Sequence, residues 1–477
     1  MIETLIMKIA FLQSIWQEMI GPLILAEILE KKGHIVRFFM LDRTYLQQLI
    51  QFQPHILSLS VYTGNHNQML QTATKLKSIL TPKPIIIMGG PHPTFFPQVI
   101  MHPSVDAICR GEGEIYFPQF IEQCQDQLMP LSIPNFWIKH HGNMIQNPMG
   151  NLLVNLDEIP ILKRHSLYSY YPFFKNAPYK WVFAGRGCPY NCSFCFNAAY
   201  RQLYKNKGVY IRRRSVNHLI EELIYLKTNY RVSLFMFGDD IFSLDKKWLF
   251  EFSERYNQLV NIPFGCNIHA NHIDEDIVLM LKHANCSVVA FGIETGNETQ
   301  RKIALNKNVS NQDIEFCVRL LKKYRIKFQT YNMLGFPGET LSQSFETVRI
   351  NQLIKPFYAW CSIATPYPGT QMSAICMNDF NQSLDQQMDA IDETYMSSSM
   401  IPSPHSHSIM NLHKFFACIV KFPWIEPLVK RLIHLPPNPL FNFIYIIFYG
   451  LHQKIRHNMS WKDAMQLYFT QKLNRHL

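Results

Sequence analysis

The strongest constraint on the fold is an alternation of short apolar runs with helix-forming stretches, which occurs twice along the 477 residues. The first occurrence has five runs of strand length, at residues 8–12, 34–40, 55–60, 84–88 and 105–108. Helices are expected at residues 23–32, 67–80 and 115–125. Continuous apolar strands separated by helices indicate a parallel sheet covered on both faces. We therefore expect an N-terminal α/β domain over residues 1–130, built on a doubly wound parallel sheet.

The second occurrence begins after residue 180 and has six strand-length runs, at residues 181–184, 234–237, 264–268, 287–293, 327–333 and 359–363. Helices are expected between them, notably at residues 216–228, 247–257, 276–283 and 311–324. Six strand–helix units predict a partial (β/α)6 barrel over residues 181–370, with its chemistry on the loops at the carboxyl ends of the strands.

Two further segments complete the predicted organisation. Residues 131–180 read as a linker that contains a small hairpin, with its turn at 141–143. Residues 371–477 are rich in Met and aromatic side chains. We expect them to form a mainly α-helical extension that packs over the active site or contributes to the choice of substrate.

Composition limits the classes of partner. Hydrophobic residues make up 47% of the chain and charged residues 17%, which is typical of a globular protein. The net charge is +11, yet the basic residues are dispersed and the densest run is only Arg212 to Arg214. No nucleic-acid-binding motif accompanies them, so we expect no nucleic acid partner. An anionic cofactor or substrate would use the charge equally well.

Cysteine usage and hydropathy bear on localisation. Eleven scattered cysteines and no secretory signal predict a reducing, cytoplasmic setting without a disulfide framework. The chain has no run of 18 or more apolar residues, so no transmembrane helix is expected. The nearest approach is residues 440–451, with Lys430, Arg431, Lys454 and Arg456 around it. A buried helix is the favoured interpretation, and an interfacial helix in peripheral contact with a membrane is the alternative.

Three of the cysteines, Cys188, Cys192 and Cys195, lie in one short loop with the sequence GRGCPYNCSFCFNAAY. Thiolates at this spacing can each bind a different iron of a four-iron, four-sulfur (4Fe-4S) cluster. Only three ligands are local, which leaves one iron open to a substrate. Structural zinc sites usually combine two separate ligand pairs, and no second pair follows here. The spacing favours a cluster and leaves zinc as the alternative.

Polar residues follow three later strands of the predicted barrel. The first group is Gly238, Asp239 and Asp240, where the acids would face a cation or cap a helix, the cap being Asp240 or Ser243. The second is Glu294, a carboxylate that is costly at the end of an apolar strand unless it has a partner. The third is a Gly-Phe-Pro-Gly turn that begins at Gly335, with Thr340 as the expected cap of the next helix.

The cysteine loop resembles the signature of the radical S-adenosylmethionine (SAM) superfamily, Cys-x-x-x-Cys-x-aromatic-Cys, with Phe194 in the aromatic position. The resemblance implies that the open iron chelates SAM and that one electron cleaves it to methionine and a 5′-deoxyadenosyl radical. It also implies an electron donor such as flavodoxin or ferredoxin. The SAM-binding residues expected from this resemblance and from the strand ends are Phe194, Gly238, Asp239, Asp240, Glu294 and Gly335.

The N-terminal domain resembles the cobalamin-binding domain that precedes many radical SAM domains. The resemblance rests on residues 88–94 and 106–114, which follow two of the predicted strands. Open parallel sheets bind ligands beyond the carboxyl ends of their strands. No dinucleotide fingerprint follows the first strand. The residues expected to contact cobalamin are Ser60, Thr63, Gly89, Gly90, Pro91, His92, Gly111 and Glu112. The chain lacks the Asp-x-His-x-x-Gly motif, so no histidine from that motif would ligate cobalt, and His92 is also typical of a hydrogen-bonding loop residue.

These resemblances cover about residues 55–370 and imply a cobalamin-dependent radical SAM enzyme that methylates an unactivated carbon. Its substrate would be a small molecule, with apolar or lipid-like compounds among the options. A related function keeps the cofactors but oxidises, cyclises or rearranges the substrate, as the anaerobic cyclase of porphyrin ring formation does. The sequence also leaves open a domain that has lost cobalamin, a non-catalytic cobalamin or redox sensor, and a zinc-stabilised nucleic-acid protein.

Overall fold

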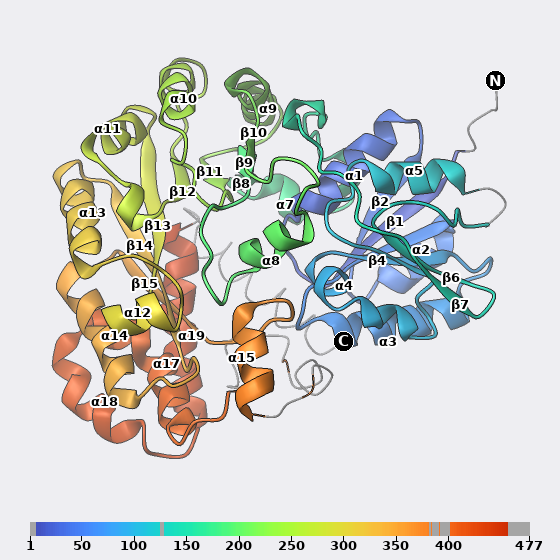
Figure 1. Ribbon diagram of the computed structural model, residues 1–477. Helices are drawn as coiled ribbons and strands as arrows, with labels where there is room; N and C mark the ends of the chain where they lie inside the picture. Colours follow the sequence, from blue (N-terminus) through green and yellow to red (C-terminus); the bar gives the residue numbers. More distant parts are fainter. Residues whose placement is uncertain (1–5, 125–127, 381–382, 384–390, 392–400, 457–477) are drawn as a thin grey trace.

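The computed structural model describes residues 6–124, 128–380, 383, 391 and 401–456, and it contains two large sheets side by side (Figure 1). The N-terminal sheet is drawn in blue and cyan, and the second sheet in green to orange. Helix α8 (Phe196–Leu203) lies between them, close to α4 (Pro91–Phe95). The fold is the predicted combination of a doubly wound sheet, a partial barrel and C-terminal helices.

The N-terminal sheet has the order β2-β1-β3-β4-β5-β6-β7. Its first five strands are parallel, and their bounds are β1 (Lys8–Gln13), β2 (Ile35–Met40), β3 (Ile56–Ser60), β4 (Ile85–Gly89) and β5 (Ala107–Cys109). The helices of this domain are α1 (Ile20–Lys31), α2 (Tyr45–Phe52), α3 (His66–Ile79), α4 and α5 (Tyr116–Gln123). Helix α2 was not among the predicted elements.

Strand β1 shows why the sheet is covered on both faces. Ile9 and Phe11 belong to one apolar core together with residues of α1 and α5. Ala10 and Leu12 belong to a second core with residues of α2 and α3. Successive side chains of a strand point to opposite faces, so a continuously apolar strand needs helices on both sides.

The predicted hairpin is present as β6 (Phe136–His140) and β7 (Asn143–Gln146), but it extends the N-terminal sheet. Strand β6 pairs antiparallel with β5, with Ile108 opposite Trp137. The hairpin therefore pairs the edge that β5 would otherwise leave open, and the short strand β7 becomes the new edge of the sheet. Short helices α6 (His165–Tyr168) and α7 (Pro172–Asn176) follow before the barrel begins.

The second sheet is a partial barrel of six parallel strands in the order β15-β14-β13-β12-β11-β8. Its strands are β8 (Tyr179–Val182), β11 (Leu234–Phe237), β12 (Phe264–Asn267), β13 (Cys286–Glu294), β14 (Lys327–Leu334) and β15 (Tyr358–Ile363). Its principal helices are α9 (Val216–Asn229), α10 (Lys246–Leu259), α11 (Glu275–His283), α13 (Asn311–Lys323) and α14 (Leu341–Ile354). Shorter elements are the ribbon of β9 (Gly185–Arg186) with β10 (Arg212–Arg213) and helix α12 (Glu298–Ile303).

Side-chain caps fix where these helices begin. Thr340 caps α14 through a reciprocal pair of hydrogen bonds with Gln343, as the sequence predicted. Helix α10 is capped by Asp245, which accepts a hydrogen bond from the backbone N–H of Trp248. The expectation that Asp240 or Ser243 caps this helix was therefore wrong, because the chain makes another turn before α10 starts.

The C-terminal helices occupy two places. Helix α15 (Gln371–Phe380) lies near the cysteine loop, where the backbone N–H of Met372 donates to the carbonyl of Ser193 at 2.9 Å. Helices α17 (Ser406–Lys421), α18 (Glu426–Leu432) and α19 (Pro439–Arg456) share an apolar core with β15 and α14. They thus extend the barrel at its β15 edge, and the rest of the predicted extension lies outside the described residues.

Residues 440–451 form most of α19, and they are not the buried helix that the sequence favoured. Phe441 is buried, but Leu440 and Phe443 are exposed over more than half of their surface. In the part of the chain that the structure describes, no helix is both long and apolar enough to cross a bilayer.

Candidate active site

The cysteine loop follows β9 and runs into α8, at the carboxyl edge of the barrel sheet. Cys188, Cys192 and Cys195 are partly exposed. Seven of the other eight cysteines are buried, the exception being Cys418 of α17. Thiols that could serve as ligands are therefore gathered in the loop that the spacing singled out.

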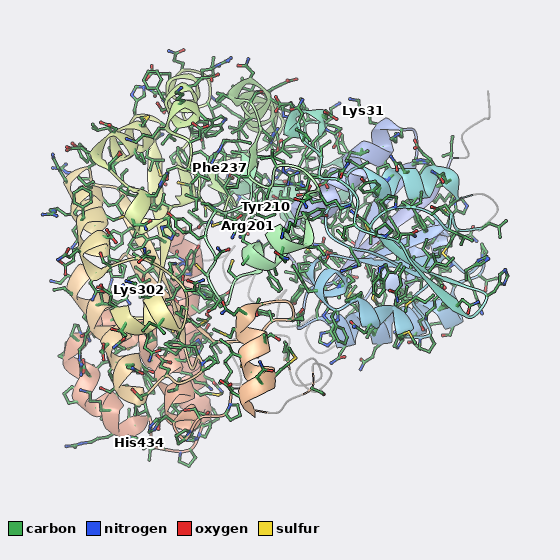
Figure 2. The ribbon with its side chains drawn as sticks, viewed as in Figure 1. Lys31, Arg201, Tyr210, Phe237, Lys302 and His434 are labelled. Atoms are coloured by element: carbon green, nitrogen blue, oxygen red, sulfur yellow. The ribbon has the colours of Figure 1, made fainter. Side chains whose placement is uncertain are left out.

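Neighbouring side chains and backbone hold the cysteine loop in place. The guanidinium of Arg201 donates to the carbonyls of Cys188 at 2.7 Å and Tyr190 at 3.1 Å. Figure 2 labels Arg201 in the middle of the view. On the other side, Ser193 donates through its hydroxyl to the carbonyl of Ala304 at 2.8 Å. The loop is thus fixed between α8 and the segment that follows α12.

Without a bound cation, the surroundings of the three cysteines favour neutral thiols over thiolates. Burial raises the pKa of Cys188 to about 11 and that of Cys192 to about 12, and nearby thiols and carboxylates add to both rises. A bound cation reverses this balance because it stabilises the thiolate form. Within the described ranges, no three His, Cys, Asp or Glu side chains converge on one metal ion. A four-iron cluster does not need such convergence, since each cysteine binds a different iron.

Asn197, which the sequence analysis did not single out, connects the loop to an acid. Its side-chain amide lies 3.7 Å from the Cys195 sulfur and donates to Asp240 at 2.8 Å. Tyr210 donates through its hydroxyl to the Asn197 side-chain carbonyl at 2.8 Å. Asp240 therefore stands beside the cysteine loop, where the sequence placed it. The one sequence signal that could have pointed to Asn197 is that it lies two residues after Cys195.

Asp239 lies at the start of the cysteine loop, where a backbone hydrogen bond from Gly185 favours its charged form. It is buried and accepts a hydrogen bond from the backbone N–H of Ala184 at 2.9 Å, with Arg213 at 3.9 Å. Burial raises its pKa to about 6, and the charge of Arg213 opposes that rise. In this geometry Asp239 holds the end of β8, and a role in binding SAM stays a prediction. A Cβ at Gly238 would lie 2.5 Å from the Phe183 ring, so no side chain fits there.

Glu294 ends β13 with a left-handed backbone, at φ +66°. Its carboxylate pairs with Lys307 at 2.8 Å, and both side chains are about nine-tenths buried. Lys307 also favours the thiolate of Cys192, although burial has the larger effect on the pKa of that thiol. The ion pair that the sequence left open is present, and it lies beside the cysteine loop. Nothing in the sequence around Lys307 marked it as part of the site.

The apolar side of the loop is formed by Phe194. Its ring packs against a core that includes Met333, Phe336 and Met372. The next predicted residue, Gly335, follows β14 and donates its backbone N–H to Glu339. Residues from the end of β14 and from α15 thus pack around the aromatic position of the cysteine motif.

The loops predicted to bind cobalamin lie side by side at the carboxyl edge of the N-terminal sheet. The backbone N–H of Val61 donates to the carbonyl of Gly89 at 2.8 Å, and that of Gly111 donates to Thr94 Oγ1 at 2.8 Å. Six of the predicted contact residues are partly exposed at this edge, namely Ser60, Gly89, Gly90, Pro91, Gly111 and Glu112. Three of the six are glycines, which let a large ligand approach the backbone closely.

The other two predicted residues, Thr63 and His92, are buried beneath the surface of these loops. Thr63 Oγ1 lies 3.2 Å from His92 Nδ1, and the His92 ring stacks on His66 with centroids 4.3 Å apart. Burial lowers the pKa of His92 to about 3, so its ring is neutral. His92 supports the fold of the loop from below, which matches its interpretation as a hydrogen-bonding loop residue.

The loops that carry Gly89, Gly90 and Gly111 are called the glycine loops below. Two sets of contacts join them to the cysteine loop. Phe95 of α4 stacks on Phe196 of α8, with centroids 5.0 Å apart, and Tyr200 meets Phe95 edge-on at 4.8 Å. Glu112 pairs with Arg212 at 2.5 Å and with Arg186 at 3.2 Å. The basic run that could have indicated nucleic acid is thus used, through Arg212, in an ion pair between domains.

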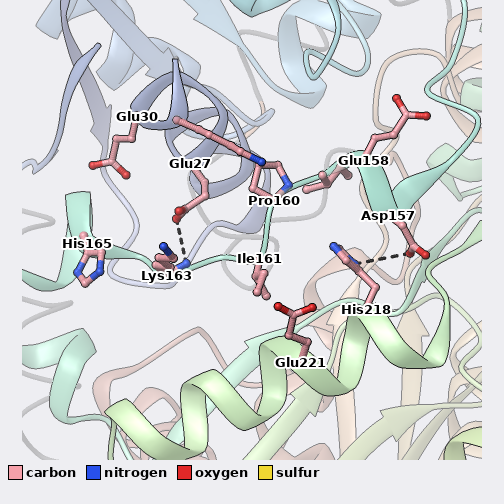
Figure 3. Close-up of a pocket in the computed structure, with 12 residues that line it drawn as sticks. Glu27, Glu30, Asp157, Glu158, Pro160, Ile161, Lys163, His165, His218 and Glu221 are labelled. Carbon is pink, nitrogen blue, oxygen red and sulfur yellow. Dashed lines mark hydrogen bonds and ion pairs between the residues drawn. The ribbon is translucent and has the colours of Figure 1, made fainter. Parts of the chain in front are cut away.

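A separate cavity of about 590 Å³ lies between α1, residues 157–165 and α9 (Figure 3). Its lining includes five carboxylates, two lysines and two histidines. Burial and the neighbouring Glu27 raise the pKa of Glu30 to about 7. None of the lining residues belongs to the cysteine loop or the glycine loops, so this cavity is not part of the candidate active site.

Comparisons with known proteins agree with this geometry. The family model described as the radical SAM superfamily matches residues 182–349, and the one described as the B12 binding domain matches residues 17–121. An uncharacterized methyltransferase of Pyrococcus horikoshii is 30% identical over 329 residues, which make up 68% of this chain and 69% of the relative.

Two further proteins are more distant. The anaerobic magnesium-protoporphyrin IX monomethyl ester cyclase of Rubrivivax gelatinosus is 25% identical over 410 residues, covering 81% of this chain and 70% of the relative. The radical SAM methyltransferase TsrM of Kitasatospora setae, solved with cobalamin and an iron–sulfur cluster bound, has a TM-score of 0.65 at 16% identity. That alignment covers 79% of this chain and 75% of TsrM, and it shows the shared fold. The chain therefore belongs to the radical SAM superfamily, in the group that carries a B12-binding domain before the radical SAM domain.

Proposed function

We propose that this protein is a cobalamin-dependent radical SAM enzyme that transfers a methyl group to an unactivated carbon of a small molecule. The observation that carries the proposal is the meeting of the cysteine loop with the glycine loops through Phe95 and Phe196. Methyl transfer of this kind requires both cofactors at one substrate. An arrangement that brings their two candidate sites to a single junction supports it.

Each part of the site has a role in this proposal. Cys188, Cys192 and Cys195 would hold the cluster, and Asn197 and Lys307 would orient and stabilise their thiolates. SAM would lie over Phe194, between Asp240 and the Glu294–Lys307 pair. Gly89, Gly90 and Gly111 would let cobalamin approach the edge of the N-terminal sheet. A domain division at about residues 130, 180 and 370 goes with these roles.

When bound, the cofactors would supply the electron that cleaves SAM and the methyl group that is transferred. The chain itself would position the reactants and exclude water, which is the usual contribution of a protein to cofactor chemistry. The rings of Phe95, Phe196 and Tyr200 fit that task because they line the junction with apolar surface. A flavodoxin or ferredoxin would deliver the electron.

A second candidate keeps these cofactors but oxidises or cyclises its substrate. It is favoured by the similarity to the cyclase of Rubrivivax gelatinosus, which covers 81% of this chain. The mass of the product separates the two candidates, because methylation adds one methylene to the substrate and oxidation does not.

The test is anaerobic reconstitution, followed by iron, sulfide and cobalt analysis and by an assay for 5′-deoxyadenosine with a chemical reductant. We expect Cys192→Ala to lose both the cluster absorbance and the production of 5′-deoxyadenosine. Cys418→Ala is the matched control, since Cys418 is also partly exposed but lies in α17. Retained cleavage of SAM in Cys192→Ala would contradict the assigned ligands. Iron without cobalt in the reconstituted protein would contradict the dependence on cobalamin.

A further inference from the structure

The C-terminal helices carry an unusual share of the exposed apolar surface. Of the 25 large hydrophobic side chains exposed in the described part of the chain, eight lie between residues 422 and 447. They are Phe422, Trp424, Leu428, Leu435, Leu440, Phe443, Ile446 and Ile447. Scattered exposed hydrophobic residues need no explanation, whereas residues gathered in one region mark an interaction surface.

Helix α19 shows how this surface arises. Leu440, Phe443 and Ile447 recur at spacings of three and four residues, so they share one face, and they are 61%, 58% and 43% exposed. The opposite face is anchored by Phe441, whose ring packs on Phe415 of α17 with centroids 4.8 Å apart. The helix is therefore apolar on both faces, and the described residues cover only one of them.

An apolar groove of about 620 Å³ opens where α17 and α19 end. Its walls include Phe357, Val420, Phe448 and Leu451. Lys355 and Lys421 also line it, and both are exposed. The groove thus combines an apolar interior with two cationic side chains, which is the pattern that an amphiphile with an anionic head would match.

Aromatic contacts join the groove to the exposed surface. The Phe422 ring lies 6.3 Å from that of Phe448 inside the groove and 6.4 Å from that of Trp424 outside it. Trp424 is 78% exposed. Aromatic residues with such an amphipathic character are typical of the boundary between lipid headgroups and acyl chains.

Charge distinguishes among the possible occupants. Residues 401–477 contain nine Lys or Arg and two Asp or Glu, so this stretch carries +7 of the net charge of +11. One of the two acids, Glu426, is already paired with Lys430 at 2.7 Å. A second copy of the chain would bring two strongly basic regions together, which is electrostatically unfavourable. An anionic surface is the complementary partner.

We propose that α17, α18 and α19 dock this protein on an anionic membrane. The exposed apolar side chains would enter the headgroup boundary, and Lys355, Lys421 and Arg431 would contact lipid phosphates. This is attachment to one leaflet, as expected of an amphipathic helical surface with basic flanks.

The experiment is co-sedimentation of the full-length protein with vesicles of phosphatidylglycerol and phosphatidylcholine, compared with phosphatidylcholine alone. We expect binding to the anionic vesicles only, weakened by salt because exposed charges are screened. Phe443→Ser and Lys421→Glu should each lower the affinity about tenfold. Phe443→Ser removes an apolar side chain that would enter the headgroup boundary. For Lys421→Glu, a basic residue at such a surface contributes about fivefold, and the new carboxylate adds repulsion. Circular dichroism checks that each variant is folded.

Helix α10 offers matched controls on another face of the molecule. Phe250 is 60% exposed and Lys247 is exposed on the same helix, so Phe250→Ser and Lys247→Glu should bind vesicles as the wild type does. Equal losses in both pairs of variants, or no binding of the wild type to anionic vesicles, would overturn the proposal. So would light scattering that shows a dimer which Phe443→Ser converts to a monomer, because the occupant would then be a second copy.

Discussion

Glu339 is a carboxyl group buried next to the candidate SAM site. It accepts a hydrogen bond from the backbone N–H of Gly335, and burial raises its pKa to about 8. In an unfolded chain the same group would titrate near 4.5. Between these two values the folded protein keeps a proton that the unfolded chain releases. Stability should therefore fall as the pH rises through this interval.

The Glu339→Gln variant tests this linkage at a single residue. Glutamine keeps an acceptor for Gly335 but does not titrate, so the variant should lose the part of the decline in stability between pH 5 and 8 that Glu339 contributes. The slope for one proton is at most about 1.4 kcal/mol per pH unit. The measurement is the urea midpoint of the apo protein as a function of pH, with Glu315→Gln, an exposed site on α13, as the control. An unchanged slope in Glu339→Gln would show that the buried carboxyl is already ionised in the folded protein.

Local spacing was enough to locate the cysteine loop, because its three cysteines lie within eight residues of one another. It could not find Lys307 or Arg201, since a lysine and an arginine carry no local sign of what the fold places beside them. It also could not tell Asp239 from Asp240. Adjacent residues point to different sides, and only the fold decides that Asp239 holds the end of β8 while Asp240 meets Asn197.

At the scale of elements, the apolar runs predicted every strand of both parallel sheets with small shifts at the ends, because buried parallel strands are apolar throughout. Helix α2 was missed because it is only eight residues long and three of them are glutamines, which leaves a short apolar pattern. The pairing of the hairpin with β5 was missed for another reason. A hairpin has the same sequence pattern whether it stands alone or completes a sheet, and the choice depends on the edge that β5 leaves open.

Gly90 joins β4 to α4, and its geometry leads to a prediction about that connection. Its φ is +107°, and a Cβ there would lie 2.5 Å from the carbonyl oxygen of Val61. We expect Gly90→Ala to displace the glycine loops and to lower the cobalamin content of the reconstituted protein, with the iron content unchanged. Gly142→Ala is the matched control, because Gly142 has φ +79° but nothing within 4 Å of its Cβ position. If both variants bind cobalamin equally, these loops are not the cobalamin site.

At the scale of the whole molecule, a buried ionic network connects the two sheets. Glu18 comes from the segment before α1, Arg164 from the connection between the domains, and Glu222 from α9. Tyr168 donates a hydrogen bond to Glu18, and Lys180 of β8 lies 3.9 Å from that carboxylate. Glu18 and Arg164 are 146 residues apart in sequence. No local pattern could have paired them, so the way the domains are joined emerges only from the fold.

Removing the guanidinium of Arg164, the central cation of this network, should weaken the coupling between the two domains when they unfold. Arg164 is fully buried, donates to Glu18 at 2.8 Å and to the carbonyl of Trp181 at 2.6 Å, and lies 3.5 Å from Glu222. Arg164→Met removes the principal counter-charge of Glu18, while Glu222 keeps Arg214 at 2.8 Å. Breaking a buried pair in this way costs about 3–5 kcal/mol in comparable sites. Urea denaturation followed by tryptophan fluorescence should show this loss and a second transition.

The matched control for Arg164→Met is Lys246→Met. Lys246 also sits between two acids, Asp274 and Asp276, but about half of its side chain is exposed. Exposed ion pairs contribute little to stability because water screens them, so the control should unfold in the same way as the wild type. Adding Glu18→Gln to Arg164→Met should recover part of the lost stability, because the stranded charge is then gone. If the single variant loses no more stability than the control, the Glu18 carboxylate reaches solvent or a proton without Arg164, and the network does not hold the domains together.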